Sequence, residues 1–224
     1  MINNYSLIIF DWDGTIVDSV PNIVRALKGA VEDLELPMLD DVAYKGVIGM
    51  SLGNAFSHLY PAVQEDQLEK LISAYKEHHH RLEQNASRLF EGVAEGLDKI
   101  KATGTAMAVA TGKRMAGLQR SMVANGYEGY FKHCCTADHA ASKPDPDMLF
   151  QILDKLGVSS DRTLMVGDSI HDLAMAANAG IDSVAVTYGA QEAGLLKAHR
   201  PVFLADHFDE LVSWLGVSSG RLDK

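Results

Sequence analysis

The chain has 224 residues, which is enough for one large core or for a core with a small accessory domain. Hydrophobic residues make up 47% and charged residues 22% of the sequence, close to the averages for globular proteins, which argues against disorder as the dominant state. The formal net charge of −10 argues against a general nucleic-acid binder, because phosphate backbones are held by clustered Lys and Arg.

Five short apolar runs have the character of strands. In chain order they are Leu7–Phe10, Ala106–Ala110, Leu164–Val166, Val184–Val186 and Val202–Leu204. Their hydrophobicity is nearly unbroken, which suits parallel strands that are covered on both faces. No apolar run is long enough to span a bilayer, and the first residues lack the features of a signal peptide, so we expect a soluble cytoplasmic protein with no membrane partner.

The interval between the first two runs is far longer than a simple crossover needs. It contains several helical patterns, among them an apolar stripe that follows Ser19, the expected N-cap, and a second stripe from Leu68 to Tyr75. We therefore predict an all-helical cap domain, residues 19–82, inserted into a core domain formed by residues 1–18 and 83–224.

Helical patterns also separate the later strands. One helix is predicted to begin with Asp145 as its N-cap and to end at Gly157. Another is predicted to begin after Ser169 and to end at Gly180. Strands that alternate with helices predict a doubly wound α/β sheet, which binds ligands at the carboxyl ends of its parallel strands.

The segment DWDGTIVDS, which starts at Asp11, begins where the first strand ends. Asp11 and Asp13 are separated by one residue, so they can serve a nucleophile and a metal together, and Gly14 lets the chain turn away from them. A polar turn in which the aspartates merely cap accounts for this segment equally well, since turns rich in Asp are common.

A second acidic segment, VGDSIHD, contains Asp168 and Asp172. Asp172 falls in the first turn of a predicted helix, where the helix dipole alone stabilises a carboxylate. Asp168 directly follows a strand and would stand beside Asp11 if the two strands are neighbours. Carboxylates at one sheet edge repel one another unless a cation is present, and a cluster with oxygen ligands only suits Mg²⁺ rather than Zn²⁺.

Two further positions suit an anion. Thr111 and Gly112 end the second strand and open a helix, where a hydroxyl and free N–H groups form a natural anion site, although Thr is also an ordinary N-cap. Lys143 precedes the helix that follows Asp145; a lone surface Lys is usually a solvated charge, but beside carboxylates and a phosphate it neutralises both. The case for a function rests on the four segments occurring together and in this order.

In this combination the sequence resembles the haloacid dehalogenase superfamily of hydrolases, in the subgroup with a helical cap inserted after the first strand. The residues that resemble its four motifs are Asp11–Thr15, Thr111, Lys143, and Gly167-Asp168 with Asp172. The resemblance covers about Asn4 to Leu215 and implies a Rossmann-like parallel sheet core. The segments VGDSIHDLAMAANAG, SKPDPDML and VTYGA are most similar to the phosphoglycolate phosphatase-like branch.

The resemblance implies a Mg²⁺-dependent phosphatase that acts on a small phosphorylated metabolite. Asp11 would attack phosphorus to form an aspartyl-phosphate, and Asp13 would act as general acid and base. The ion would be held by Asp11, the backbone carbonyl of Asp13 and Asp168, with Asp172 orienting bound water.

The resemblance also assigns the phosphate-binding groups. Thr111, Gly112 and Lys143 would hold the transferring oxygens, and Lys143 would also screen Asp11. An acid at residue 13, together with the metal cluster, makes a dehalogenase the weaker interpretation.

Substrate choice is expected to fall to the cap. The loop KGVIGMSLGN, Lys45–Asn54, is expected to face the catalytic edge, with Lys45, Gly49, Ser51 and Asn54 as candidate specificity residues. This loop contains no Arg, which counts against a sugar-phosphate mutase of the β-phosphoglucomutase type, the alternative on the same fold. A non-catalytic protein that kept the fold is a further alternative, and the chain is either a monomer or a homodimer.

Three further signals are expected to carry no chemistry. His78, His79 and His80 cannot converge on one ion from successive helical positions, so we expect a solvated face. Lys113 and Arg114 are expected to extend from a helix surface, with a role in attracting anions as the alternative. The adjacent Cys134 and Cys135 are expected to be free thiols, because a bond between neighbours closes a strained ring.

Overall fold

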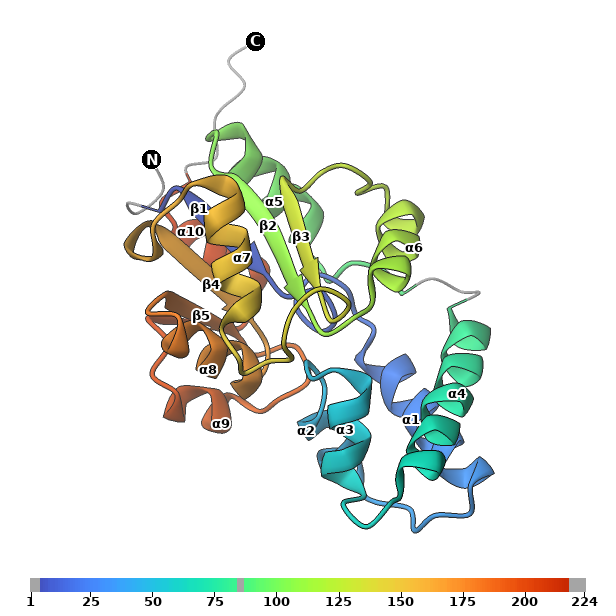
Figure 1. The fold of residues 1–224 in the computed structure, drawn as a ribbon. Helices are drawn as coiled ribbons and strands as arrows, with labels where there is room; N and C mark the ends of the chain where they lie inside the picture. The colour runs from blue at the N-terminus through green and yellow to red at the C-terminus, as the bar shows by residue number, and fades with distance from the viewer. Residues whose placement is uncertain (1–4, 84–86, 218–224) are drawn as a thin grey trace.

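A six-stranded sheet, parallel throughout, lies at the centre of the computed structural model, which describes residues 5–83 and 87–217 (Figure 1). The strands are β1 (Leu7–Phe10), β2 (Ala106–Thr111), β3 (His133–Thr136), β4 (Thr163–Gly167), β5 (Asp182–Val186) and β6 (Phe203–Ala205). Their order across the sheet is β3-β2-β1-β4-β5-β6. The chain therefore moves from β1 toward one edge and then returns to the other side of β1, which confirms the predicted doubly wound α/β core.

Helices pack on both faces of this sheet, and further helices lie beyond its edge. In chain order the helices are α1 (Val20–Asp33), α2 (Asp41–Gly46), α3 (Leu52–Leu59), α4 (Glu65–Leu82), α5 (Val93–Ala102), α6 (Met115–Asn125), α7 (Asp147–Leu156), the 3-10 turn η1 (Ser160–Arg162), α8 (Ile170–Asn178), α9 (Ala193–Ala198) and α10 (Phe208–Trp214). None of them, within the described residues, is long and apolar enough to cross a membrane.

The core has two apolar layers because successive strand residues point to opposite faces of the sheet. Ile8 and Phe10 of β1 pack in a cluster with α5, α6 and α10, whereas Leu7 and Ile9 pack in a cluster with α7 and α8. All four side chains are fully buried. This two-sided burial explains why the strand reads as an unbroken apolar run.

Helices α1–α4 gather beside the carboxyl edge of the sheet and share an apolar cluster of their own (Figure 1). The stripe predicted on α1 is buried there, as Val24 and Leu27 illustrate, and α4 contributes the fully buried Leu71. A separate core is what an inserted cap requires. The domain boundaries at residues 19 and 82 remain predictions.

The strand β3 was not predicted. Its sequence, His133-Cys134-Cys135-Thr136, contains no apolar run, and it forms the edge of the sheet by pairing with β2 alone. Cys134 and Cys135 are both free, as expected, and burial raises the pKa of the Cys134 thiol to about 11.

Two helix starts differ in detail from the prediction. The N-cap of α7 is Pro146 rather than Asp145, although the Asp145 carboxylate accepts the Asp147 N–H at 3.0 Å. Ser19 does precede α1, but its hydroxyl caps no helical N–H. That hydroxyl has another partner in the site described next.

Candidate active site

The site begins where the three central strands end. The Asp11 amide donates to the Val166 carbonyl of β4 at 2.9 Å, so the chain leaving β1 is held against its neighbour. Thr111 is the last residue of β2, and Asp168 follows β4 directly. Because these strands are parallel and adjacent, their carboxyl ends bring the three side chains to one edge of the sheet.

Three buried carboxylates meet at this edge. One oxygen from each of Asp11, Asp168 and Asp172 lies within 4.8 Å of the other two. All three side chains are at most 2% exposed. The structure therefore brings together the acidic residues that the sequence placed in two separate motifs.

Lys143 is the cation of this cluster. Its ammonium nitrogen lies 2.5 Å from Asp11 Oδ1 and 2.6 Å from Asp172 Oδ1, and the residue is only 1% exposed. Burial opposes the charge of Lys143, but the two carboxylates outweigh burial and raise its pKa. Lys143 is therefore not a solvated surface charge.

The backbone and two hydroxyls orient the other carboxylates. Asp168 accepts hydrogen bonds from the Thr15 hydroxyl at 3.0 Å and from the Ala190 N–H at 2.6 Å. Asp172 forms a capping box with Ser169, whose hydroxyl and N–H both donate to Asp172 Oδ2. These bonds fix Asp168 in the loop after β4 and Asp172 in the first turn of α8.

Gly14 is required for this arrangement. Its φ is 91°, in the left-handed region, and a Cβ atom at this position would collide with the Asp168 carboxylate. The glycine thus lets the turn after Asp13 pass directly against Asp168.

The charge balance of the cluster fits a divalent cation. Burial raises the pKa of Asp11 well above its ordinary value, with Asp172 and Asp168 adding to the rise and Lys143 opposing it. Burial and the neighbouring Asp172 raise the pKa of Asp168 to about 7. Three carboxylates against one ammonium leave an excess of negative charge, and the donor atoms are all oxygens, which suits Mg²⁺.

Asp13 has different partners from Asp11. Its carboxylate accepts the Ser19 hydroxyl at 2.6 Å and binds the Lys113 ammonium through both oxygens, at 2.9 and 3.0 Å. The Lys113 ammonium also lies 4.0 Å from Glu83 Oε1, at the end of α4. The expectation that Lys113 extends from a helix surface is wrong, because these carboxylates draw it inward to 12% side-chain exposure.

Thr111 and Gly112 form the loop after β2. Thr111 is buried, and its hydroxyl oxygen accepts the Lys113 N–H at 3.2 Å. A Cβ atom at Gly112 would collide with the backbone carbonyls of Gly49 and Met50. The absence of a side chain at residue 112 therefore lets the loop between α2 and α3 approach this edge closely.

The α2–α3 loop, residues 47–51, is hydrogen-bonded to the core at both ends. The carbonyl of Gly46 accepts hydrogen bonds from the ring nitrogen Nε2 of His171 at 2.8 Å and from the Gln191 side-chain amide at 3.3 Å. The Ser51 N–H donates to the Ser142 hydroxyl at 2.8 Å. These bonds hold the loop against the core, beside the edge that carries the carboxylates.

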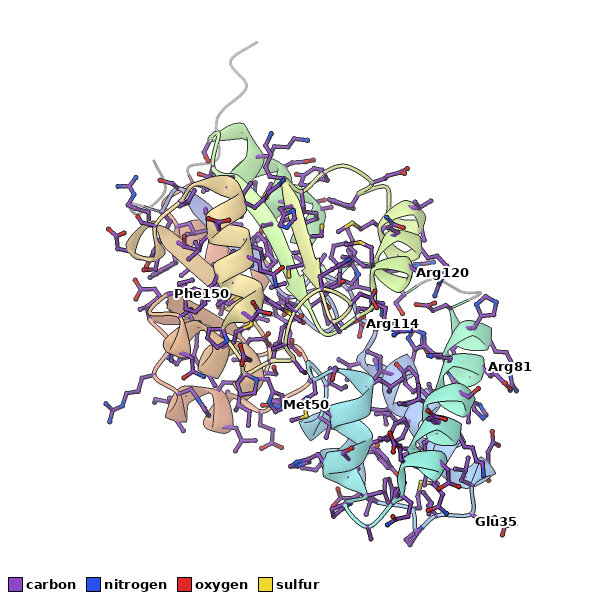
Figure 2. The ribbon with its side chains drawn as sticks, in the orientation of Figure 1. Glu35, Met50, Arg81, Arg114, Arg120 and Phe150 are labelled. Carbon is purple, nitrogen blue, oxygen red and sulfur yellow. The ribbon has the colours of Figure 1, made fainter. Side chains whose placement is uncertain are left out.

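A cavity of about 510 Å³ lies between this loop, helices α1, α3 and α4, and the sheet edge. Asp11, Asp13 and Thr111 line it on the side of the sheet. Figure 2 shows Met50 from the α2–α3 loop, and Arg114 and Arg120 from the opposite side, at the junction of the two parts.

The four candidate specificity residues are placed differently. Gly49 and Ser51 line the cavity, whereas Lys45 and Asn54 are exposed and lie outside its lining. The two lining residues belong to the loop that contacts Gly112. The other two lie in α2 and α3, turned toward solvent.

The histidine run does not form a solvated face throughout. His78 Nε2 lies 2.8 Å from Asp33 Oδ2, and His79 stacks on Tyr75 with 5.2 Å between ring centroids. His79 Nδ1 also lies 3.4 Å from Glu83 Oε1, and its side chain is 12% exposed. The expectation was therefore wrong for His79, whereas His78 contacts a different carboxylate and His80 is exposed.

Sequence reasoning did not identify Ser19, Lys113 or Glu83 as part of the site. The available signal for Lys113 was its position directly after Thr111-Gly112, at a strand end. Glu83 carried no such signal, because only the packing of α4 against the core brings it to Lys113 and to Arg120, whose guanidinium lies 3.4 Å away.

Comparison with known proteins agrees with this geometry. A family model described as haloacid dehalogenase-like hydrolase matches residues 8–186. A protein of Dickeya dadantii described as probable phosphatase IndB is 37% identical over 212 residues, covering 92% of this chain and 91% of that protein. A phosphoglycolate phosphatase of Vibrio parahaemolyticus is 30% identical over 221 residues, covering 95% and 97% of the two chains.

A solved structure shares the whole architecture. The crystal structure of a hydrolase from Pseudomonas syringae superposes with a TM-score of 0.87 at 25% identity and covers 94% of this chain and 98% of that one. The similarity extends over both the sheet and the helices α1–α4.

Proposed function

The chain belongs to the haloacid dehalogenase-like hydrolase family and is a phosphatase, as the sequence predicted. We propose that it hydrolyses a small phosphate monoester with Mg²⁺ through a phosphorylated Asp11. The observation that carries the proposal is the contact of Lys143 with both Asp11 and Asp172, with Asp168 in the same cluster. The buried ammonium offsets the negative charge of the Asp11 carboxylate, which lowers its repulsion of an anionic phosphate ester.

Asp11, Asp168 and the backbone carbonyl of Asp13 would hold the ion, and Asp172, whose oxygens accept from Lys143 and Ser169, would orient bound water. The fit rests on the oxygen-only donor set and on the excess negative charge of the cluster. When bound, Mg²⁺ neutralises charge on the phosphate oxygens and on the attacking carboxylate.

Asp11 supplies the nucleophile. Lys143 binds its Oδ1 and orients the carboxylate, which lines the cavity. We propose that a carboxylate oxygen of Asp11 attacks phosphorus while the bond from phosphorus to the ester oxygen breaks. Water then attacks phosphorus, the bond to Asp11 breaks, and inorganic phosphate leaves.

Asp13 is proposed to move the protons. It donates one to the departing ester oxygen and takes one from the attacking water. In the structure Lys113 and Ser19 hold the Asp13 carboxylate at the cavity. An incoming phosphate is an alternative partner for Lys113, and we expect it to draw Lys113 away so that Asp13 can take up a proton.

Thr111, Gly112 and Lys143 are proposed to bind the transferring oxygens. The Thr111 hydroxyl accepts the Lys113 N–H, which leaves its own hydrogen available for a phosphate oxygen. Gly112 does not open the helix as expected, because α6 begins at Met115 with Arg114 as its N-cap, but its N–H lies in the loop that leads into that helix.

The mutase alternative is less well supported. A sugar-phosphate mutase needs a group in the cap that binds the second phosphate of its substrate. The loop Lys45–Asn54 contains a single cation, Lys45. Lys45 is exposed and lies outside the cavity lining. The cytoplasmic location, the oligomeric state and the absence of nucleic-acid and membrane partners remain predictions from the sequence.

A rapid-quench experiment tests the proposed chemistry. With a substrate carrying ³²P in its phosphate, we expect label on the wild-type protein and release of phosphate that stops when a chelator removes Mg²⁺. Asp11→Asn should take up no label and lose about 10⁴-fold or more of the turnover.

The exposed Asp161 of η1 provides a matched control. Asp161→Asn should be labelled and should turn over like the wild type. Activity that survives chelation, or label retained by Asp11→Asn, would contradict the proposal.

A further inference from the structure

We propose that the leaving group of the physiological substrate has a bulky apolar portion and carries no negative charge of its own. This inference rests on the phosphatase function proposed above and adds a substrate class to it. The evidence comes from the two sides of the cavity and from the pairing state of its charged side chains.

One side of the cavity is aliphatic. Its main side chains are Ile23, Leu27, Val47, Ile48, Leu52 and Ile72. Among the lining residues contributed by α1, the α2–α3 loop and α3, only Ser51 has a hydroxyl, amide or charged group. A charged leaving group beside this wall would lose hydration without replacement bonds, whereas an apolar one would gain by leaving water.

The other side carries cations that already have partners. Lys113 pairs with Asp13 at 2.9 Å, and Arg120 pairs with Glu83 at 3.4 Å. Arg114 pairs with Asp138 at 3.0 Å. A carboxylate on the leaving group would therefore compete with a protein carboxylate for each of these side chains.

Two other basic side chains line the same side. Lys76 and His80 lie on α4, and both are exposed to solvent. Charges in that setting bind an anion weakly, because water and salt screen them. Lys76 and His80 therefore do not alter the preference of the cavity for an uncharged, apolar leaving group.

The size of the cavity points the same way. A volume of about 510 Å³ is within the range of sites that bind whole organic ligands. A two-carbon leaving group would fill a small part of it and leave the half-buried Leu52 and Ile72 of the wall in contact with water. A leaving group of six or more carbons would cover that wall.

The experiment compares esters with the same kind of leaving oxygen. We would measure kcat/KM with Mg²⁺ for ethyl, butyl and hexyl phosphate and for phosphoglycolate, which has a two-carbon, carboxylate-bearing leaving group. We expect kcat/KM to rise along the alkyl series, with hexyl phosphate about tenfold or more above both ethyl phosphate and phosphoglycolate.

The outcomes separate the two proposals. A flat alkyl series, or phosphoglycolate as the best of the four substrates, would overturn the inference while leaving the phosphatase intact. Hydrolysis of none of the four esters would overturn both.

A substitution in the aliphatic wall tests whether the leaving group binds there. Leu52 is half-buried at the start of α3 and lines the cavity. Leu52→Asn should lower kcat/KM for hexyl phosphate about tenfold more than for ethyl phosphate. Leu195→Asn, the same change at a 54% exposed position in α9, should leave the ratio of the two values unchanged.

A second variant guards against misfolding. If Leu52→Asn lacks the circular dichroism of the wild type, Ile72→Thr makes a smaller change in the same wall. A folded wall variant with an unaltered ratio of hexyl to ethyl phosphate would overturn the inference.

Discussion

The carboxylate edge of the sheet, which reaches the cavity through Asp11, and the aliphatic wall of the cavity are built in opposite ways. At the edge, Asp11, Asp168, Asp172 and Lys143 are at most 2% exposed, and every one of them is hydrogen-bonded. Within residues 5–83 and 87–217, no buried side-chain nitrogen or oxygen lacks a hydrogen-bond partner. The wall offers shape and apolar surface with almost no directional bonds.

This difference separates the reaction from the choice of substrate. Charges that act on the phosphate must be held in fixed positions, because catalysis by electrostatics depends on preorganised groups. Apolar contacts are non-directional, so a wall can accept several leaving groups of similar size. Changes at the edge should therefore affect all esters alike, and changes in the wall should alter their ratio.

The largest effect is expected for Lys143→Met. Removal of the ammonium leaves Asp11 and Asp172 without their buried partner, which should cost roughly 3–5 kcal/mol of unfolding free energy. The kcat/KM values should fall about 10³-fold for ethyl and hexyl phosphate alike. Urea unfolding and initial rates measure both effects.

Lys155→Met, at an exposed position on α7, is the control for Lys143→Met and should change neither quantity. A large change in the ratio of the two esters in Lys143→Met would break the proposed separation of edge and wall.

Removal of Mg²⁺ should have the next largest effect, and it should depend on pH. The pKa of Asp168 is about 7 in the folded protein, against 3.8 as its ordinary value, so without the ion the stability falls as pH rises between these values. Mg²⁺ competes with protons for the carboxylates, so its stabilisation should be greater at about pH 8 than at about pH 5.

Thermal unfolding measures this stabilisation. At about 100 times its Kd, a ligand that binds only the folded state contributes about 2.7 kcal/mol. Asp168→Asn should lose most of the Mg²⁺-dependent shift in Tm. Equal stabilisation at the two pH values would argue against an ion held by these carboxylates.

A smaller effect is expected for Lys113→Met. The variant removes the ammonium that binds both oxygens of Asp13, so we expect kcat to fall about 10–100-fold with little change in the ratio of esters. Its pH–rate profile should shift, which a purely structural role would not cause. Lys132→Met, at an exposed position before β3, should retain the wild-type profile.

The smallest effect is expected for Glu83→Gln. Burial alone would raise the pKa of Glu83, but His79, Lys113 and Arg120 lower it from 4.5 to about 2. The stabilisation is therefore present above pH 4.5 and is lost as pH falls toward about 2. Because solvent screens the pairs in part, we expect a loss below about 1 kcal/mol at neutral pH.

Chemical unfolding at several pH values measures the contribution of Glu83. The difference between wild type and Glu83→Gln should shrink as the solution is acidified. Glu77→Gln, which removes an exposed pair with Arg81, should show no comparable difference. A difference that grows in acid would contradict the assignment.

Much of the catalytic edge could be predicted from the sequence. Asp11, Thr111 and Asp168 stand directly at strand ends, and adjacent parallel strands necessarily bring such residues to one edge. The helical insertion could also be predicted, because the apolar residues of α1 recur with the period of a helix that buries one face. The strand β3 was missed because its four residues, His133–Thr136, contain no apolar run to reveal it.

Only the tertiary structure decided which charges meet and which side chains face the substrate. Ser19 looked like a helix cap but donates to Asp13, and Lys113 looked solvated but lies between Asp13 and Glu83. Within the loop Lys45–Asn54, the structure turns Ser51 toward the cavity and Asn54 toward solvent. Local periodicity reports which face of an element is apolar, whereas an ion pair or a cavity wall depends on elements that are distant in the chain and meet only after packing.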